Sequence, residues 1–285
     1  MGSHESDAPN VPVNPLPVPV TAAGREGLAA LLDRPEKAVI ALDFDGTLAP
    51  IVADPESARA HPDAVRVLAA LAPKVASVAV ITGRPAEIAV RYGGFAGVPG
   101  LEHLVVLGAY GAERWDAVSG RVVAGEEHPG VTAVRAELPA LLDAGDTWVE
   151  DKGRAVAVHT RRAADPQGAF EALREPLGAL AGRHGLIVEP GRFVLELRPP
   201  GMDKGAALRD HVRGVGGGVV LYGGDDLGDL PAFAAVEGLR GEGVPGVLVC
   251  SGSDEVAALA ARADVVVDGP GGVVTLLSSL AERMG

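Results

Sequence analysis

The sequence predicts an α/β protein with a Rossmann-like core, in which a parallel sheet has helices on both faces, and an inserted α+β cap domain with an antiparallel sheet. Two observations predict the core. Short apolar segments alternate with segments of helical periodicity up to about residue 111, and the same rhythm returns after residue 200. A third observation predicts the insertion, because strand candidates in between alternate apolar and polar residues. We therefore expect a core of residues 26–111 and 199–285 and a cap of residues 112–198.

The first half of the core is predicted from four segments. The apolar segment 38–43 is the first expected strand and ends at two aspartates. A helix is expected over 63–72, where apolar residues recur on one face. The segments "VASVAVITG" (75–83) and "HLVVLGAYG" (103–111) predict two more strands, with a helix opened by Pro85 between them.

The residues ahead of this core, 1–25, are rich in proline and polar side chains. Such a composition cannot bury much apolar surface. We expect a disordered or extended arm there and assign no role to it.

The cap domain is predicted from weaker, alternating patterns. Two helices are expected, near 131–143 and 165–182, and Asp165 followed by proline is a typical start for the second. The segment "EDKGR" (150–154) is expected to be a hairpin turn. The strand candidates are 121–124, 147–152, 155–161, 186–189 and 192–198.

The second half of the core repeats the α/β alternation. "DKGAALRDHV" (203–212) predicts a helix, "GGVVLYGGDD" (217–226) a strand and "LGDLPAFAAV" (227–236) a helix. Two more strands are expected at "GVLVCSG" (246–252) and "DVVVDG" (264–269). Helical segments follow them at 254–263 and 271–283.

Composition restricts the class of partner. The net charge of −13 argues against nucleic acid and anionic membrane surfaces, and no apolar run approaches the ~20 residues of a membrane span. The one cysteine, Cys250, lies in an apolar run, so we expect a buried thiol, no disulfide within the chain and a reducing, cytoplasmic location. The histidines lack the spacing of a zinc site. The sequence does not fix the oligomeric state, and a monomer is compatible with it.

Four polar motifs fall at strand ends or at the start of a helix. They are "DFDGT" (43–47), "ITGR" (81–84), Asp203-Lys204 and "GGDDLGD" (223–229). Ligands of parallel α/β sheets bind outside the carboxyl ends of the strands, so we expect these motifs to meet there. A turn or capping role would explain one acidic pair at a strand end, but not four motifs in order.

These motifs resemble the signature of haloacid dehalogenase (HAD) superfamily phosphatases, and more narrowly that of trehalose-6-phosphate phosphatases. The narrower resemblance is carried by "LDFDGTLAPIV", "VEDKGRAVAVHTR", "LELRPPGMDKGAAL" and "GGDDLGDLPAF", and it spans about residues 38–235. It implies a Mg²⁺-dependent phosphatase that works through an aspartyl-phosphate. Trehalose 6-phosphate is the favoured substrate.

The chemistry agrees with the residue types. Phosphoryl transfer brings a nucleophile against a phosphate dianion, and Mg²⁺, which prefers oxygen ligands, would offset that repulsion. Asp43 and Asp225 are suitable ligands, and the resemblance adds the main-chain oxygen of Asp45. Asp226 is expected to act through water or to be a solvated acid, and Asp229 to support the metal or to orient Lys204.

The catalytic set follows from the same motifs. Asp43 is expected to attack phosphorus, and Asp45 to protonate the sugar oxygen and then activate water. Lys204 would supply positive charge and Thr82 a hydroxyl, while a surface lysine and a structural turn hydroxyl are the simpler alternatives. Further contacts with the substrate phosphate are expected from Gly46, Thr47, Gly83 and Arg84.

The sugar is expected to meet the cap. The resemblance implies that Glu150 and Lys152 bind sugar hydroxyls, and alternation places Glu196 and Arg198 on a polar strand face and His159 on another. Solvated charges on the sheet are the alternative for all five. The family often has Asn-His before the glycine that ends the third strand, whereas this chain has Ala109 and Tyr110 before Gly111. We expect Tyr110 and Gly111 to contact substrate there, with an effect on specificity.

Two other functions remain open. The first is a phosphatase for another disaccharide, pseudo-disaccharide or glycosylglycerate phosphate, which would share the core and cap. The second is a non-enzymatic sugar-phosphate sensor on the same fold. The intact set of Asp43, Asp45, Lys204 and Asp225 argues against a sensor, because a sensor could lose its nucleophile.

Overall fold

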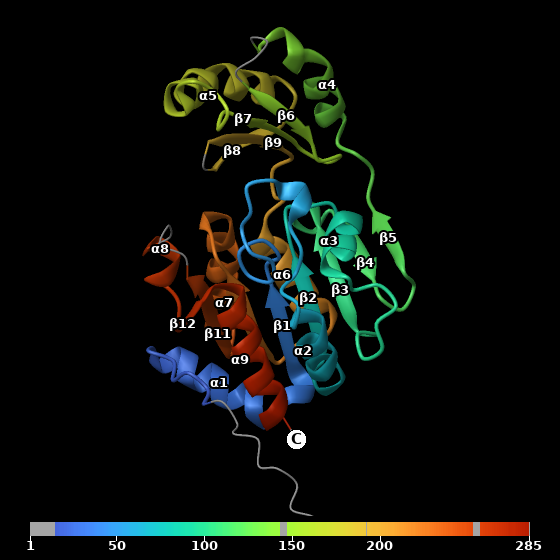
Figure 1. Ribbon diagram of the computed structural model, residues 1–285, viewed down its shortest axis with the longest axis vertical. Helices are drawn as coiled ribbons and strands as arrows, with labels where there is room; N and C mark the ends of the chain where they lie inside the picture. Colours follow the sequence, from blue (N-terminus) through green and yellow to red (C-terminus); the bar gives the residue numbers. More distant parts are fainter. Residues whose placement is uncertain (1–14, 143–146, 192, 253–256, 285) are drawn as a thin grey trace, which may run out of the picture.

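Two sheets, one above the other, organise the molecule (Figure 1). The structure, a computed structural model, describes residues 15–142, 147–191, 193–252 and 257–284. The larger sheet has eight strands in the order β12-β11-β10-β1-β2-β3-β4-β5, and the smaller has four in the order β6-β7-β9-β8. This arrangement confirms the predicted α/β fold class.

The larger sheet is parallel from β12 to β3, and β4 and β5 extend it antiparallel. Its central strands are built from residues that are buried on both faces, which is why they are continuous apolar runs. The strands are β1 (Ala38–Leu42), β2 (Ser77–Ile81), β3 (Leu104–Gly108), β4 (Glu113–Asp116), β5 (Arg121–Ala124), β10 (Val219–Gly224), β11 (Gly246–Gly252) and β12 (Val265–Asp268).

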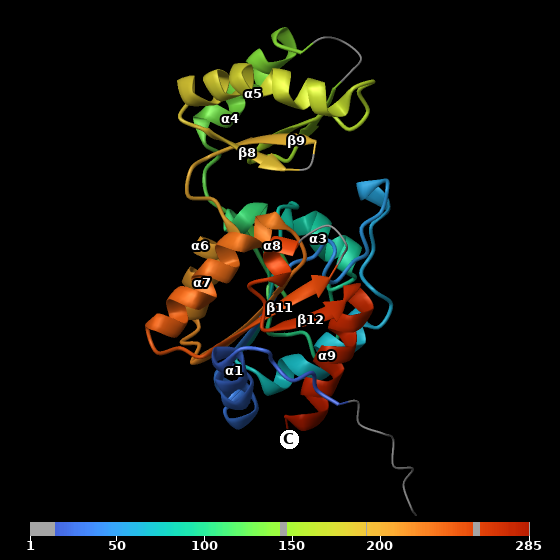
Figure 2. The same cartoon turned by 90° about the vertical axis from the view of Figure 1, so that its left-hand side faces the viewer.

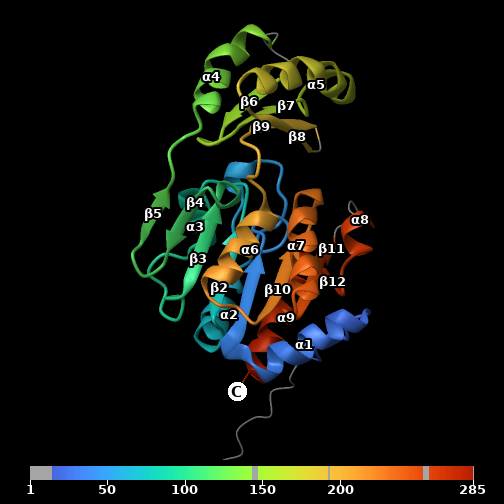
Figure 3. The same cartoon turned by 180° about the vertical axis from the view of Figure 1, so that it is seen from behind.

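Helices cover both faces of this sheet and bury two separate apolar clusters against it. One face packs on α2 (Ala64–Leu71), α3 (Ala86–Gly93) and α9 (Gly269–Arg283). The other packs on α6 (Lys204–Gly214), α7 (Leu230–Gly241) and α8 (Ala257–Ala260), and Figure 3 shows α6 and α7 in front of the strands. The expected helix at 254–263 is described only from residue 257 onward.

The N-terminal prediction needs a correction. Helix α1 (Ala22–Asp33) begins inside the region 1–25 that was expected to be an extended arm. The Thr21 side chain accepts a hydrogen bond from the backbone of Gly24 and so caps the helix. Val20 is tied to the core by a hydrogen bond of 2.8 Å from its amide to the carbonyl of Asp264. Residues 1–14 lie outside the described part of the chain.

The smaller sheet is wholly antiparallel, as predicted, and two helices cover one of its faces. Leu195 and Leu197 face the helices, so Glu196 and Arg198 face the other way, toward the larger sheet. The elements are β6 (Trp148–Asp151), β7 (Val156–His159), β8 (Ile187–Gly191), β9 (Val194–Arg198), α4 (Pro129–Glu137) and α5 (Pro166–Arg183).

The expected start of the cap at residue 112 is also corrected. Strands β4 and β5 lie between residues 113 and 124 and belong to the larger sheet, because β4 pairs with β3, with Val105 opposite Asp116, and β5 pairs with β4. The smaller sheet and its helices therefore begin after residue 124. We call the larger sheet with its helices the larger unit, and the smaller sheet with α4 and α5 the smaller unit. Two connections join these units, one from β5 to α4 and one from β9 to α6 (Figures 2 and 3).

Two further predictions can be compared with the structure. Cys250 is buried in β11, as expected. Within the described residues, no helix combines the length and the apolar content that crossing a membrane requires.

Candidate active site

A cleft of about 220 Å³ lies where the carboxyl ends of β1 and β2 face the smaller sheet. Both units line it. The larger unit contributes ten residues, which are Asp43, Asp45, Pro55, Thr82, Gly83, Arg84, Tyr110, Lys204, Asp226 and Gly228; the smaller unit contributes Glu150 and Lys152. Four predicted motifs far apart in the sequence therefore meet here.

The turn after β1 places two aspartates at the cleft. Asp43 continues the strand, since its amide donates to the carbonyl of Gly223 at 2.8 Å. Gly46 then takes a φ of +71°, which favours glycine, and its carbonyl accepts a hydrogen bond of 2.6 Å from the Ser251 hydroxyl. The turn is thus fixed from two sides, and Asp43 is only 4% exposed.

Lys204 joins the acids from the first turn of α6. Its Nζ lies 2.9 Å from Asp43 Oδ1 and 2.8 Å from Asp229 Oδ1, and all three side chains are buried. Burial alone would lower the pKa of Lys204, but Asp229 and Asp43 raise it well above its ordinary value. Lys204 therefore stays cationic beside Asp43.

Asp229 anchors this lysine. Its Oδ1 accepts hydrogen bonds from Lys204 and, at 2.6 Å, from the Tyr222 hydroxyl; its Oδ2 accepts from the amides of Asp225 at 2.9 Å and Asp226 at 3.1 Å. Both oxygens are already used, so of the two expected roles the geometry favours orienting Lys204 over binding a metal. Tyr222 was not among the predicted site residues.

The acids suit a divalent cation. Asp43 and Asp225 offer oxygens to a cation, and these atoms and an oxygen of Asp229 lie within 4.8 Å of one another. Burial, Asp229 and Asp226 raise the pKa of Asp225 to about 8. Burial also raises the pKa of Asp43, against the opposing effect of Lys204. A cluster of buried oxygen donors that resists ionisation on its own fits Mg²⁺, because the cation would offset the repulsion.

The other aspartate of the turn, Asp45, is held by an arginine. Arg84 Nε and Nη2 each donate to a different oxygen of Asp45 at 2.7 Å, which is a bidentate pair. The pKa of Arg84 is lowered by burial and raised by Asp45, with a net rise. Thr82 accepts a hydrogen bond from the Arg84 amide at 3.1 Å, so the segment 82–84 forms one wall of the cleft.

Tyr110 reaches the cleft from an unusual turn. Ala109 and Tyr110 have φ values of 46° and 55°, and their amides donate to the carbonyls of Arg84 and Thr82. The Tyr110 hydroxyl donates to Glu196 Oε2 at 3.3 Å. Burial and Glu196 raise the pKa of Tyr110 to about 12, so it remains a neutral donor. Tyr110 therefore bridges the two units.

The polar face of the smaller sheet carries a paired network. Lys152 Nζ lies 2.6 Å from Glu196 Oε2, whereas Glu196 Oε1 is buried and has no partner among the described residues. Glu150 lies 2.9 Å from His159 Nε2, and the His159 ring stacks on Trp148 at a centroid distance of 4.5 Å. Free acceptor capacity at Glu196 suits a hydroxyl-rich ligand.

Eight of the predicted site residues lie outside the lining of the cleft. Gly46 packs so closely on Asp225 that an added Cβ would meet Asp225 Oδ2 at 1.9 Å. Thr47 is buried, and its hydroxyl has no partner in the described part of the chain. Arg198 bonds Glu189 at 2.9 Å and lies over the Tyr110 ring. Four more of the predicted site residues also lie outside the lining of the cleft: Asp225, Asp229, His159 and Glu196.

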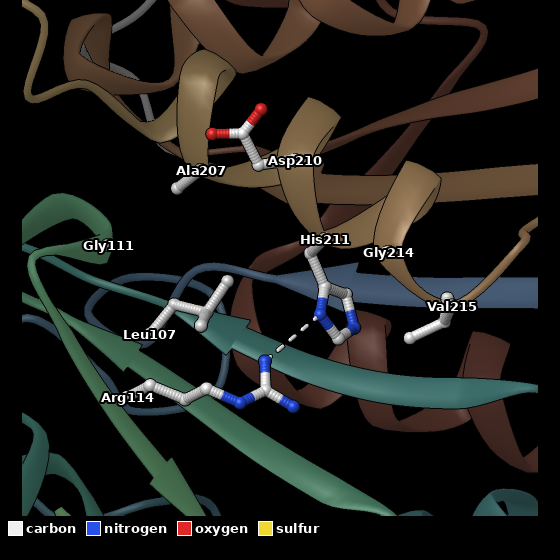
Figure 4. Close-up of a pocket in the computed structure, with 8 residues that line it drawn as sticks. All are labelled: Leu107, Gly111, Arg114, Ala207, Asp210, His211, Gly214 and Val215. Carbon is white, nitrogen blue, oxygen red and sulfur yellow. Dashed lines mark hydrogen bonds between the residues drawn. The ribbon is translucent and has the colours of Figure 1, made fainter. Parts of the chain in front are cut away.

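Gly111 faces a different cavity (Figure 4). This second cavity, of about 360 Å³, lies between α6 and β3–β4, and Gly111 is in its wall together with Arg114 and His211. The structure therefore does not bring Gly111 into the cleft. His211 Nε2 lies 2.9 Å from the Ser77 hydroxyl, and Arg114 donates to His211 Nδ1 at 3.4 Å.

Two residues that line the cleft were not predicted, Pro55 and Gly228. Gly228 lies inside the quoted acidic motif and donates its amide to Asp226 Oδ1 at 2.8 Å, which makes Asp226 a cap of its own turn. Pro55 opens a short 3-10 helix, Pro55–Ser57, 12 residues after Asp43 in the numbering, where the sequence carries no chemical motif.

Comparisons with known proteins agree with this geometry. The family model for trehalose-phosphatase matches residues 41–265. A trehalose-phosphate phosphatase of Mycobacterium avium is 34% identical over 274 residues, which cover 92% of this chain and 65% of that protein. The chain thus spans slightly less than two thirds of the length of that relative.

Solved structures share the fold. The C-terminal domain of Candida albicans trehalose-6-phosphate phosphatase superposes with a TM-score of 0.72 at 20% identity, covering 94% of this chain and 99% of that one. A haloacid dehalogenase-like hydrolase from Bacteroides thetaiotaomicron gives a TM-score of 0.57 at 17% identity, covering 84% and 98%. The fold is therefore that of HAD-like hydrolases.

Proposed function

The chain belongs to the trehalose-phosphatase family, and from that premise we propose that it hydrolyses trehalose 6-phosphate to trehalose and inorganic phosphate with the help of Mg²⁺. The observation that carries the proposal is the buried contact of Asp43 with Lys204, beside Asp225, at the edge of the sheet where the parallel strands have their carboxyl ends. Such a cluster places a nucleophile next to fixed positive charge and a cation site.

The residues that would hold Mg²⁺ are Asp43 and Asp225, with the main-chain oxygen of Asp45 as a third ligand. When bound, Mg²⁺ supplies positive charge that screens the acids from the phosphate and polarises the phosphoryl group. Asp226, which lines the cleft, would accept a hydrogen bond from a water molecule near these ligands.

Asp43 attacks phosphorus through a carboxylate oxygen. The new O–P bond forms an aspartyl-phosphate as the bond from phosphorus to the sugar oxygen breaks. Lys204 favours the ionised form of Asp43, an effect that a bound cation would reinforce, and it attracts the phosphate, while the Thr82 hydroxyl donates to a phosphate oxygen.

Asp45 handles the proton. It donates a proton to the departing sugar oxygen, and then takes one from the water whose oxygen attacks phosphorus and releases Asp43 and inorganic phosphate. Because Arg84 occupies both oxygens of Asp45, Arg84 has to turn away before an oxygen of Asp45 can exchange a proton with the sugar or water. The incoming phosphate is a competing anionic partner for Arg84.

The smaller sheet would bind the sugar. Glu150 and Lys152 line the cleft opposite Asp43, and Glu196 has an unused oxygen beside Lys152. These groups offer acceptors and a cationic donor to hydroxyls. Tyr110 stands at the position of the histidine in the Asn-His pair that the resemblance led us to expect, so the preferred sugar is the first part of the proposal to be tested.

The experiment is phosphate release from a panel of sugar phosphates with and without Mg²⁺. Trehalose 6-phosphate is expected to be turned over fastest, only with Mg²⁺, and Asp43→Asn is expected to be inactive. Preference for another disaccharide or a glycosylglycerate phosphate would replace the substrate but keep the reaction. Absence of turnover on every sugar phosphate, with binding retained, would contradict the enzyme and favour a sensor.

A further inference from the structure

We propose that Arg154 and Glu113 form a latch that fixes the smaller unit over the cleft and positions the segment from Thr82 to Arg84. Neither residue lines the cleft, so both are positioning residues. The inference rests on the proposed phosphatase function and adds to it the device that couples closure to the acid–base group. The latch is defined as the side chains of Arg154 and Glu113 and the backbone groups that they bond.

Arg154 lies in the hairpin turn between β6 and β7, the same hairpin that carries Glu150 and Lys152. Its guanidinium donates to the carbonyl of Glu126 at 3.1 Å and to that of Gly125. Its Nε lies 3.8 Å from Glu113 Oε1. One side chain of the smaller unit thus bonds the connection after β5 and meets the first residue of β4.

Glu113 connects this contact to the wall of the cleft. Its second oxygen, Oε2, accepts the amide hydrogen of Ala86 at 2.8 Å, at the start of α3, where Pro85 offers no side-chain cap. Ala86 lies two residues after Arg84, which holds both oxygens of Asp45. A continuous series of contacts therefore runs from Arg154 through Glu113 and the start of α3 to the proposed general acid.

The two side chains of the latch are largely buried, which sets their contact apart from an ion pair on the surface. The side chains of Arg154 and Glu113 are each only 16% exposed, unlike the ion pairs on the outer surface of the smaller unit. Gly108, which pairs with Glu113 in the sheet, packs on α3 so closely that an added Cβ would meet the Ala86 amide nitrogen at 2.2 Å. The paired strands β3 and β4 therefore pack tightly on the start of α3 at this point, and we expect a shift of Glu113 to displace that start.

The contacts of Tyr110 with the smaller unit cannot serve as the latch during turnover. Tyr110 lines the cleft and donates to Glu196 just behind the lining, and sugar hydroxyls would compete for the same carboxylate. The cleft volume of about 220 Å³ also lies below the ~300–1,000 Å³ usual for ligand pockets, so the units have to separate to admit a disaccharide. The latch lies outside that volume and can close again with substrate in place.

The decisive variant is Arg154→Ala, assayed on two substrates. For trehalose 6-phosphate, which needs the smaller unit, KM is expected to rise at least about fivefold, the result of losing one charged contact and two hydrogen bonds. For p-nitrophenyl phosphate, which has no sugar, kcat/KM is expected to stay within about twofold. Arg154→Lys should recover part of the lost sugar-phosphate activity.

The matched control is Arg174→Ala. Arg174 pairs with Glu171 at 3.4 Å on α5 of the same unit, and both side chains are more than half exposed. It removes an arginine and an ion pair without touching the latch. It should leave both substrates unchanged.

Two variants of Glu113 separate its two contacts. Glu113→Gln keeps an oxygen for the Ala86 amide and leaves the bonds of Arg154 to Gly125 and Glu126, so only the charged contact is lost and KM should rise less than in Arg154→Ala. Glu113→Ala also loses the bond to the Ala86 amide, so kcat for p-nitrophenyl phosphate should fall as well. The double variant Arg154→Ala/Glu113→Gln should be no worse than Arg154→Ala alone.

A readout without catalysis keeps the latch testable if the substrate proposal fails. Amide hydrogen exchange of the unliganded protein should be faster around residues 125–128 and at Ala86 in Arg154→Ala, and unchanged in Arg174→Ala. Equal losses on both substrates, or no change in exchange at Ala86, would overturn the latch. Failure of the wild type to hydrolyse any sugar phosphate would overturn the proposed function instead.

Discussion

At the scale of single residues, paired charges explain how acids are kept at the mouth of a buried strand. Asp43 is offset by Lys204, Lys204 is held by Asp229, and Asp229 is in turn bonded by Tyr222. A buried ion pair gives little net stability, but removing one partner leaves the other uncompensated. The cluster is therefore arranged for reactivity more than for folding.

Removing the Tyr222 hydroxyl tests this chain of support. Tyr222→Phe keeps the ring in the core and takes one hydrogen bond from Asp229, so we expect a loss of about 1–2 kcal/mol in the free energy of unfolding. Because Asp229 then positions Lys204 less firmly, kcat should fall while KM changes little. Urea unfolding and steady-state kinetics measure the two effects, and an unchanged kcat would show that Tyr222 supports the fold alone.

His211 predicts a pH dependence of stability. Burial, and then Arg114, lower the pKa of His211 from 6.5 to about 4. The unfolded chain therefore takes up a proton before the folded protein does as the pH falls. The stabilisation is complete above pH 6.5 and is lost between pH 6.5 and about 4, by roughly 3 kcal/mol in all.

The check is urea unfolding of wild type and His211→Gln between pH 7.5 and 4.5. The variant should lose less stability over that range than the wild type does. His103→Gln, which changes an exposed histidine, is the control and should follow the wild type. Parallel curves for all three proteins would refute the role given to His211.

At the scale of elements, turns and helix starts bring the chemistry together. The turn after β1, the segment after β2 and the first turn of α6 all end at one edge of the sheet, and each is fixed by backbone hydrogen bonds. Apolar strands and their flanking motifs made these elements predictable. The pairing of Arg84 with Asp45 was not predictable, because a side chain's partner across 39 residues depends on the folded geometry.

Other elements carried weaker patterns. Strand β4, "ERWD", is mostly charged and contains no apolar run, and β5, "RVVA", is short and exposed along its whole length. Their membership in the larger sheet therefore depends on long-range register. Helix α1 contains two glycines that lower its helix propensity, although Thr21 is a typical N-cap that could have marked its start.

Gly46→Ala tests the turn after β1, with Gly97→Ala as the matched control. Both glycines have a φ near +70°, but a Cβ at Gly46 would meet Asp225 whereas one at Gly97 meets nothing within 4 Å. Gly97→Ala should cost about 1 kcal/mol, the strain of the left-handed backbone alone. Gly46→Ala should cost clearly more in unfolding experiments; equal losses would mean that Asp225 moves aside freely.

At the scale of the whole molecule, the two sheets contribute different groups to the proposed reaction. The larger unit holds the acids, the lysine and the proposed cation site, and the smaller sheet presents Glu150 and Lys152, the proposed sugar-binding groups, across a cleft that both line. The division into an α/β core and an antiparallel insertion was predictable from the period of the apolar pattern. How the units contact each other was not, since Arg154, Glu113 and Tyr110 meet only in three dimensions.

Metal addition should stabilise the whole molecule. Because Asp43 and Asp225 are buried acids that repel each other, Mg²⁺ should raise the melting temperature, and EDTA should reverse the rise. The increase should vanish in Asp225→Asn. It should persist in Asp63→Asn, where an aspartate on the surface is changed. A melting temperature that does not change when Mg²⁺ is added at millimolar concentration would contradict the proposed ligand set.

The most direct measurement of the central claim is to trap the covalent phosphoryl group during turnover. Borohydride reduces an aspartyl-phosphate to homoserine, which mass spectrometry locates in a peptide. With trehalose 6-phosphate and Mg²⁺ present, we predict homoserine at position 43 and at no other aspartate. Turnover without that conversion, or conversion at a different residue, would contradict the account.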